Sequence, residues 1–173
     1  MKEIVVDCKG HLKGRLASVI AKQLLLGRHV VAVRVEQLTV SGTLFRNRIK
    51  FMKYLNLKVN TNPRRGPYHY RAPAKIFWKS VRGMLPHKDA HGQAALDRLK
   101  IFEGCPPAYE HVKKMVAPSA LKVLHMRADR KCTILGDLSS SVGWKHGAVV
   151  KKLEAKRIAR GHVWHAAQTK KAL

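Results

Sequence analysis

The sequence predicts an α/β protein built on a parallel sheet, and three observations lead to this prediction. Residues 4–6 form a short β-branched run, residues 15–26 repeat apolar side chains at helical spacing, and residues 30–35 form a second β-branched run. A strand, a helix and a strand in this order make a βαβ unit, in which the two strands run parallel and the helix packs on the sheet. The 173 residues fit one domain with room for an appendage.

The next two segments predict a third short strand over residues 38–40 and a second helix over residues 46–57. One side of this helix would be apolar and the other cationic. The cationic side consists of Arg46, Lys50 and Lys53.

A loop and a third helix follow. Residues 58–73 contain three prolines, which predicts a loop. Residues 74–84 predict a helix that lies on the core, because its apolar stripe is about 180° from its cationic stripe. The cationic stripe consists of Lys75, Lys79 and Arg82.

The second half of the chain carries a weaker pattern. A short helix is expected over residues 92–99 and a fourth strand at residues 101–102. Residues 121–124 and 132–135 resemble strands, because they are short apolar runs with β-branched members.

The C-terminal region predicts a helix that leaves the domain. Residues 142–160 have only a narrow apolar stripe, and a helix charged nearly all round buries little against its own domain. Gly161 predicts that no straight helix continues past Arg160, because a glycine inside a helix costs about 1 kcal/mol relative to alanine. We therefore expect a core domain over residues 1–141 and a basic helical extension over residues 142–173.

The charge balance indicates a polyanionic partner. The chain has 35 Lys and Arg against 10 Asp and Glu, a formal net charge of +25. Residues 37–88 contain 12 Lys or Arg and no acidic residue over 52 positions. A solvated basic face is the alternative for a short run, but an acid-free window of this length favours nucleic acid.

Several classes of protein are excluded. No run of about 18 apolar residues predicts a membrane span, and the N-terminus lacks the apolar stretch of a signal peptide. Cys8, Cys105 and Cys132 are too far apart for a disulfide framework or a zinc module, so we expect three reduced thiols.

A first candidate site is the glycine-bearing turn between the first strand and the first helix. A helix N-terminus presents unpaired N–H groups that suit a phosphate, and the turn itself is rich in cations. The spacing Gly10-x3-Gly14-Arg15 matches neither a phosphate-binding loop nor a dinucleotide fingerprint. The alternative is a βα turn that simply requires glycines. The candidate contacts are Lys9, His11, Lys13 and Arg15.

A second candidate site is the loop of residues 60–71. Paired arginines form forked contacts with phosphate, and aromatic rings provide stacking surfaces for unstacked bases. The alternative is a disordered basic loop. The candidate contacts are Asn60, Asn62, Arg64, Arg65, Tyr68, His69, Tyr70 and Arg71.

A third candidate site follows the third helix. His87 and His91 have the spacing of helical zinc ligands, but Pro86 and nearby glycines interrupt a helix and no third ligand is close. We therefore expect no metal, and a phosphate-facing turn formed by Arg82, His87, Lys88 and His91. The basic window contains no carboxylate to act as a general base, so we expect no enzyme, no catalytic residue and no cofactor.

Two segments resemble a known family. Residues 7–17, Asp-Cys-Lys-Gly-His-Leu-Lys-Gly-Arg-Leu-Ala, resemble the opening motif of the universal large-subunit ribosomal protein family thirteen. Residues 80–92, Ser-Val-Arg-Gly-Met-Leu-Pro-His-Lys-Asp-Ala-His-Gly, and their continuation to Gly104 resemble its second motif. The loop of residues 60–71 resembles the archaeal and eukaryotic branch, and the basic C-terminal helix resembles the eukaryotic cytosolic members.

The resemblance implies a three-layer α/β/α fold with a four-stranded, mainly parallel sheet. It also implies a structural role in which the chain binds large-subunit rRNA beside neighbouring ribosomal proteins and supports subunit assembly. The partners would then include no membrane and no small-molecule substrate. The protein would act in the cytosolic large subunit and pass through the nucleolus during assembly. The alternatives are a ribosome-free regulatory RNA-binding protein and a small nucleotide- or RNA-processing enzyme.

Overall fold

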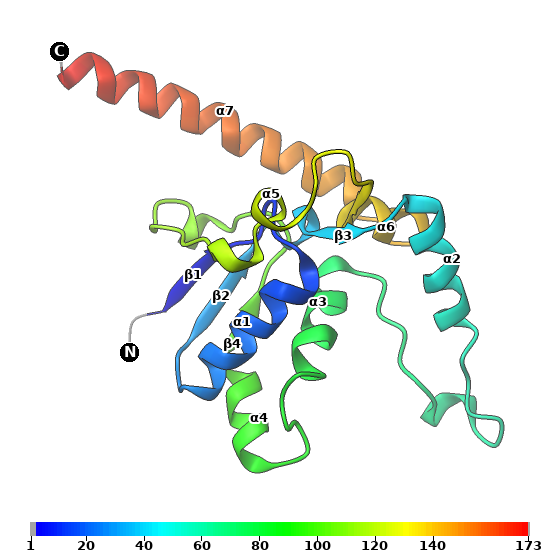
Figure 1. The fold of residues 1–173 in the computed structure, drawn as a ribbon. Helices are drawn as coiled ribbons and strands as arrows, with labels where there is room; N and C mark the ends of the chain where they lie inside the picture. Colours follow the sequence, from blue (N-terminus) through cyan, green and yellow to red (C-terminus); the bar gives the residue numbers. More distant parts are fainter. Residues whose placement is uncertain (1–2, 173) are drawn as a thin grey trace.

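The computed structural model describes residues 3–172 and confirms an α/β fold with a parallel sheet (Figure 1). Three parallel strands, β1 (Ile4–Asp7), β2 (Val30–Val33) and β4 (Leu99–Ile101), form the sheet in the order β1-β2-β4. Ile4 pairs with Val30, and Val30 pairs with Leu99. The βαβ unit predicted from the sequence is therefore the centre of the molecule.

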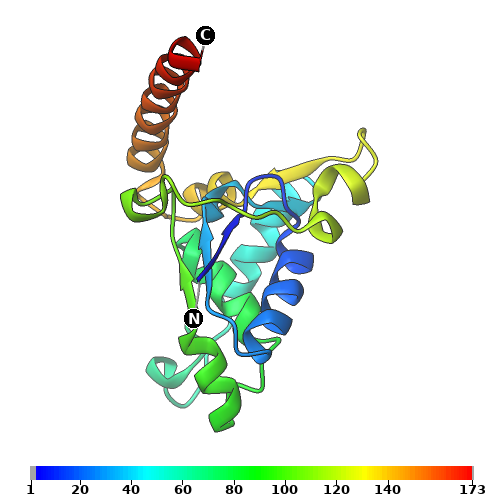
Figure 2. The same cartoon turned by 90° about the vertical axis from the view of Figure 1, so that its left-hand side faces the viewer.

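Helices α1 (Lys13–Leu25), α3 (Pro73–Arg82) and α4 (Ala90–Asp97) pack on one another and cover one face of this sheet. Figure 2 shows α1 and α3 on one side of the strands and α4 below them. Their apolar side chains, among them the fully buried Leu16 and Phe77, meet alternate residues of the strands in the main hydrophobic core. Side chains on the same face recur about every 3.6 residues in a helix and every 2 residues in a strand. The apolar residues follow these spacings, so each element has one apolar face, and these faces meet in the core.

The opposite face of the sheet has a much smaller cover. Val5, Val31 and Val33 point to this side and pack under Phe102 and Tyr109 from the segment after β4. Within the described residues, the third layer of the expected α/β/α arrangement is formed here by this segment rather than by a packed helix.

The sheet has three strands, which corrects the expected number of four. The third predicted strand, β3 (Thr39–Ser41), leaves the sheet and pairs antiparallel with β5 (Cys132–Ile134). Arg34 causes this departure, because its left-handed backbone (φ 56°) starts the short 3₁₀ helix η1 (Val35–Gln37) directly after β2.

A fourth chain segment does approach the free edge of β1. Met115 forms a single parallel bridge with Val6, through hydrogen bonds of 2.8 and 3.0 Å to the backbone of Val5 and Asp7. Pro118 follows three residues later and begins the 3₁₀ helix η4 (Pro118–Ala120), so the pairing does not extend into a strand.

The remaining helices are α2 (Leu44–Leu55), α5 (Lys122–His125), α6 (Leu135–Ser141) and two 3₁₀ turns, η2 (Pro63–Arg65) and η3 (Pro107–Tyr109). The strand-like expectation for residues 121–124 is wrong, since α5 begins at Lys122. The expectation for residues 132–135 is correct up to Ile134, where α6 follows.

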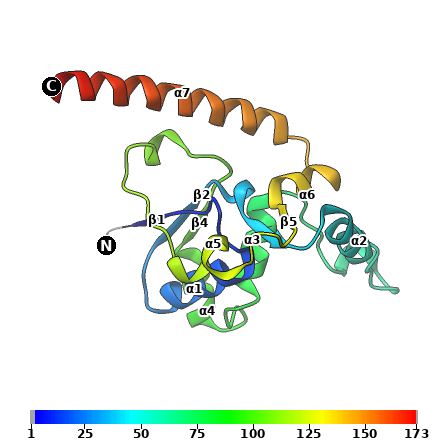
Figure 3. The same ribbon diagram turned by 45° about the horizontal axis from the view of Figure 1, so that its top comes forward.

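The C-terminal helix α7 (Gly147–Ala172) differs from the prediction at both ends. Residues 142–146 turn the chain after α6, with Gly143 at φ 108°, so the helix starts later than expected. It then continues through Gly161 to Ala172 and projects away from the core (Figures 1 and 3). The good helix formers on both sides of Gly161 outweigh its unfavourable propensity.

A cluster of ion pairs attaches the first turns of α7 to the end of the sheet. The Arg34 guanidinium donates to both carboxylate oxygens of Asp7 and lies 3.5 Å from the Glu154 carboxylate. Arg157 donates to the same Glu154 carboxylate at 2.6 and 2.8 Å. Because Glu154 is buried and paired with two arginines, this cluster fixes where α7 leaves the core.

No helix among residues 3–172 is both long enough and apolar enough to cross a bilayer.

Substituting Glu154→Gln tests the ion-pair cluster. The hydrogen bonds from Arg157 hold the pKa of Glu154 below its ordinary value of 4.5, so its contribution to folding is present above pH 4.5 and is lost as the pH falls through the lower folded value. At pH 7 we expect the variant to lose about 1.5–3 kcal/mol in urea unfolding, and the loss should shrink below pH 4.5. Asp97→Asn, an exposed amide substitution, is the control. A pH-independent loss would contradict this account.

Candidate nucleic-acid interface

The glycine turn after β1 leads directly into α1. Gly10 has a left-handed backbone (φ 74°), whereas Gly14 lies within the first turn of the helix. Leu12 is the N-cap, and no side chain caps the helix. The first amide groups of α1 therefore keep their hydrogen-bonding capacity toward an external group, and their partial charge is positive.

These amides open onto a cationic groove of about 520 Å³, here called the α1 groove. Lys13 and Arg15 line it from α1, with Thr39 and Ser41 of β3 between the two walls. The opposite wall comes from the end of α5 and the segment after it. It adds His125 and two further cations, Arg127 and Arg130, and all three are exposed.

Sequence reasoning missed the residues on this second wall. Residues 89–144 contain eight basic and six acidic residues, an ordinary balance, so the charge count of this region did not indicate a binding surface. The local sequence Arg127-Ala-Asp-Arg130-Lys131 was the available signal, because it places four charges, three of them positive, within five positions.

His11 does not belong to this surface, which corrects the expectation of a phosphate contact. Its side chain is 0% exposed. Its Nε2 accepts the Ala117 backbone N–H at 3.1 Å, so Nδ1 carries the proton and donates to the Lys9 carbonyl at 3.1 Å. His11 therefore positions the turn and the segment that carries Ala117.

The other two lysines of the turn differ in exposure. Lys9 is exposed, and its backbone N–H donates to the Asp7 carboxylate at 3.1 Å. Lys13 is half-buried, and this burial lowers the pKa of its ammonium group. A phosphate beside Lys13 would reverse this shift, because an opposite charge favours the protonated form.

Lys13 also connects the α1 groove to a second groove of about 310 Å³. The second groove runs between α2 and α3, and its rim carries Lys50 and Lys79. Its lining is mostly apolar, with Phe51, Tyr54 and Tyr70 as the aromatic members. The cationic side chains of α1, α2 and α3 therefore share one continuous surface.

Helix α2 presents its cations outward. Arg46, Lys50 and Lys53 are all exposed. The helix is held by Asn47, whose side-chain amide donates to the Ser41 carbonyl at 3.2 Å and to the Thr133 hydroxyl at 3.0 Å. Sequence reasoning missed Asn47, since a polar residue among cations gives no sign that it will be buried.

The loop after α2 is tied back to the helices through Tyr54. The Tyr54 hydroxyl donates to the Tyr68 carbonyl at 2.8 Å, and its ring meets His69 edge to face. The Lys79 ammonium donates to the Tyr54 hydroxyl and to the Tyr68 carbonyl at 2.9 Å, and it lies over the Tyr54 ring. Lys79 and His69 therefore position the loop, and both are half-buried.

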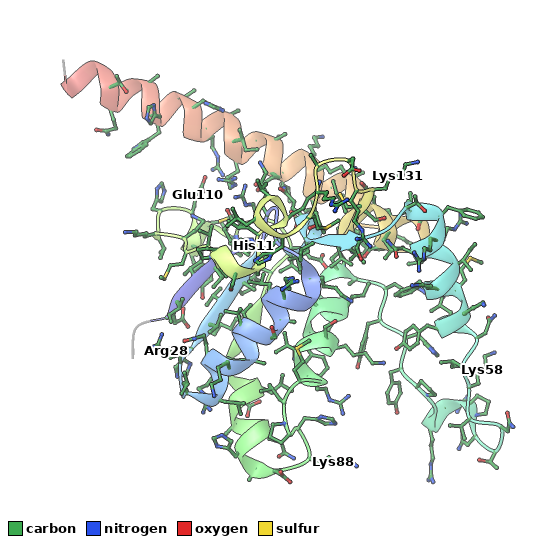
Figure 4. All side chains as sticks on the ribbon, in the orientation of Figure 1. His11, Arg28, Lys58, Lys88, Glu110 and Lys131 are labelled. Carbon is green, nitrogen blue, oxygen red and sulfur yellow. The ribbon has the colours of Figure 1, made fainter. Side chains whose placement is uncertain are left out.

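The remaining candidates of the loop face outward. The Asn62 side chain accepts the Arg64 backbone N–H at 3.1 Å and starts η2. The loop extends away from the core, and Lys58, at its start, is labelled just below α2 in Figure 4. The exposed members are Asn60, Asn62, Arg64, Arg65, Tyr68, Tyr70 and Arg71.

The outer face of α3 groups two cations around an indole ring. Lys75 lies 5.3 Å and Arg82 lies 5.9 Å from the ring of Trp78, and Tyr70 meets the same ring edge to face. Sequence reasoning named both cations and Tyr70 but missed Trp78, which holds them in place.

The third candidate segment lies at the far end of the helices. His87 is in a turn, whereas His91 is in α4, so the pair does not share one helix face. Among the described residues no three His, Cys, Asp or Glu side chains come together as a metal site. Lys88 and His91 are exposed, and Lys88 lies beside the lower end of α4 in Figure 4. Gly92 closes this turn, because a Cβ there would lie 2.0 Å from the Pro86 carbonyl oxygen.

Most carboxylates are engaged inside the molecule. Glu36 accepts the Gly104 backbone N–H at 2.8 Å, and burial raises its pKa. Glu103 accepts the Ala74 backbone N–H, Glu3 pairs with Lys100, and Asp137 pairs with Lys151. Among the described residues, no ion pair involves a cation of α2, α3 or the loop between them, so these cations are left without an internal counter-charge.

Comparison with known proteins finds similar ribosomal proteins. Residues 1–108 match the family described as Ribosomal protein L13. The chain is 56% identical over 171 residues to "Large ribosomal subunit protein uL13" of Tetrahymena thermophila, which covers 99% of this chain and 86% of that protein. It is also 56% identical over 164 residues to the protein of the same name from Dictyostelium discoideum, with 95% and 88% covered.

Substituting Tyr54→Phe tests the attachment of the loop. The substitution removes the hydroxyl that donates to the Tyr68 carbonyl and keeps the ring. One such hydrogen bond stabilises the attached loop by about 0.5–1.5 kcal/mol. We expect tryptic cleavage after Arg64 and Arg65 to become about 2- to 12-fold faster in the RNA-free protein. Tyr68→Phe is the matched control, since that ring is 65% exposed. Equal cleavage rates in both variants would contradict the assignment.

Proposed function

Because the chain belongs to the ribosomal protein L13 family, we propose that it is a structural constituent of the large ribosomal subunit that binds and stabilises large-subunit rRNA. The observation that carries the proposal is the continuous cationic surface of α1, α2 and α3. Neither α1 nor residues 37–88, which include α2 and α3, contain an acidic residue. The proposal includes no catalytic step, because the family is one of ribosomal proteins.

The packed core acts as a rigid support for this surface. Its helices and strands fix the positions of the cations, so less conformational entropy is lost when phosphates bind. Recognition is then mainly of backbone shape and phosphate, with the exposed rings of Tyr68 and Tyr70 available to unstacked bases.

The structure refines which side chains we propose as RNA contacts. His11 is excluded by burial, while Lys79 and His69 support the loop from within the protein. Arg127, Arg130 and His125 are added to the α1 groove. The other proposed contacts are Lys9, Lys13, Arg15, Arg46, Lys50, Lys53, Asn60, Asn62, Arg64, Arg65, Tyr68, Tyr70, Arg71, Lys75, Arg82, His87, Lys88 and His91.

We also propose that residues 1–141 act as the RNA-binding core and residues 142–173 as an extension toward further rRNA or neighbouring ribosomal proteins. In this assignment the protein acts in the cytosolic ribosome. It joins the large subunit during assembly in the nucleolus.

Sedimentation of a cell extract tests the proposal directly. We expect the protein to migrate with large subunits and to stay with them after a wash in high salt, because it is built into the folded rRNA. A sizeable ribosome-free pool would instead favour a regulatory RNA-binding protein. Saturable binding of a mononucleotide at the glycine turn, measured by calorimetry, would favour an enzyme.

Reversing two charges of the α1 groove tests the newly found wall. Each phosphate contact contributes about 0.7 to 0.9 to the slope of log K against log salt concentration, and about ten contacts give a slope near −7 to −9. Arg127→Glu with Arg130→Glu should weaken binding to an rRNA fragment and reduce this slope by about 1.4–1.8. Lys22→Glu with Arg28→Glu makes the same charge change in the last turn of α1 and just after it, away from the groove. Equal effects of the two pairs would contradict a localised site.

A further inference from the structure

A pocket of about 430 Å³ lies between α7 and the segment that follows β4. The segment contributes Glu110 and His111, and α7 contributes Arg157, Arg160, Gly161 and Trp164. Figure 3 shows this segment beneath α7, and Figure 4 labels Glu110 there. The volume lies in the range of small-ligand sites, about 300–1,000 Å³. None of the RNA contacts proposed above belongs to this pocket.

Trp164 forms an aromatic wall of the pocket. Its side chain is 58% exposed, although an indole ring of this size normally gains by burial. An exposed ring on a rigid helix is a stacking surface for a nucleobase, and such stacking contributes about 1–3 kcal/mol per base.

Gly161 leaves the floor of the pocket bare. The glycine is not needed for a turn, since α7 continues through it, and a Cβ there would meet no atom within 4 Å. It still costs the helix about 1 kcal/mol relative to alanine. Trp164 lies three residues later, on the same side of the helix, so the missing side chain opens the space beside the ring.

The charges of the pocket favour RNA over an apolar peptide. Arg160 is 70% exposed and only loosely paired with Glu110, at 3.5 Å, whereas Arg157 is fully engaged by Glu154. His111 is exposed on the opposite wall. From residue 145 onward the chain has eight basic residues and one acidic residue, so an anionic partner is favoured here.

We propose that this pocket receives a single unpaired RNA nucleotide, whose base stacks on Trp164 above Gly161 and whose phosphate pairs with Arg160. The Glu110 carboxylate then accepts a hydrogen bond from the edge of the base, which favours bases that carry an amino group. The inference rests on the proposed function, since it adds an RNA-binding site to the same protein.

Photo-crosslinking of the full-length protein to a single-stranded RNA hexamer that contains 6-thioguanosine, a photoreactive nucleoside that keeps an exocyclic amino group, tests the site. Adducts are mapped by mass spectrometry and counted on His111, on the wall opposite Trp164. A Trp164 variant can then lower the signal only by weakening RNA binding, because the residue that forms the adduct is unchanged. Trp164→Ala should reduce the His111 adduct about 5- to 150-fold, the factor that corresponds to one stacked base. Trp164→Phe should retain it, because a phenyl ring still stacks.

A second variant blocks the pocket without weakening the helix. Gly161→Leu replaces a poor helix former by a good one and fills the floor of the pocket. It should remove the His111 adduct while adducts on the loop of residues 60–71 remain.

The outcomes separate this inference from the proposed function. Adducts on the loop of residues 60–71 but none on His111 in the unmodified protein would overturn the nucleotide pocket alone. A protein occupant would be indicated if Gly161→Leu removed the chain from large subunits without changing any adduct, and this too would overturn the inference. The absence of adducts anywhere would contradict RNA binding itself.

Discussion

The scarcity of carboxylates is the constraint on which the rest of the structure depends. With 10 acidic groups against 35 basic ones, each acidic side chain that serves the fold leaves the surface more positive. Asp7 and Glu154 pair with Arg34 where the sheet meets α7, and Glu36 and Glu103 bind backbone N–H groups. These carboxylates are therefore used inside the fold, and none of the ion pairs among the described residues involves a cation of α2, α3 or the loop between them. Such a surface repels itself, so its stable context is a polyanion.

Arg34 links the architecture to this charge distribution. Its left-handed backbone directs the chain out of the sheet toward β3, so the antiparallel pair β3 and β5 forms beside the groove at the start of α1. Its guanidinium holds Asp7 and Glu154 together, which sets the position of α7. One residue therefore influences both the α1 groove and the helix that carries Trp164. These two sites lie on different parts of the molecule and would contact different parts of a folded RNA.

The aromatic residues of the acid-free window divide into two roles that composition alone does not separate. Tyr54 and Trp78 organise the cations around them, since Lys79 lies over one ring and Lys75 and Arg82 flank the other. Tyr68 is 65% exposed and its ring is free to stack, whereas Tyr70 is 36% exposed and keeps its edge-to-face contact with Trp78. Cations fixed on rings bind phosphate with less loss of side-chain freedom than cations on a flexible loop.

The sequence by itself determined the βαβ centre, the cationic outer faces of α2 and α3 and the basic C-terminal helix. These features follow from local periodicity and from charge, both of which are carried by neighbouring residues. Only the tertiary structure decided that His11 is buried, that Asn47 anchors α2, and that Arg127 and Arg130 face Lys13. It also decided that the fourth strand is reduced to one bridge at Met115 and that Gly161 opens a pocket rather than ending a helix. The physical reason is that burial and groove formation depend on which distant segments pack together, and no local pattern encodes that pairing.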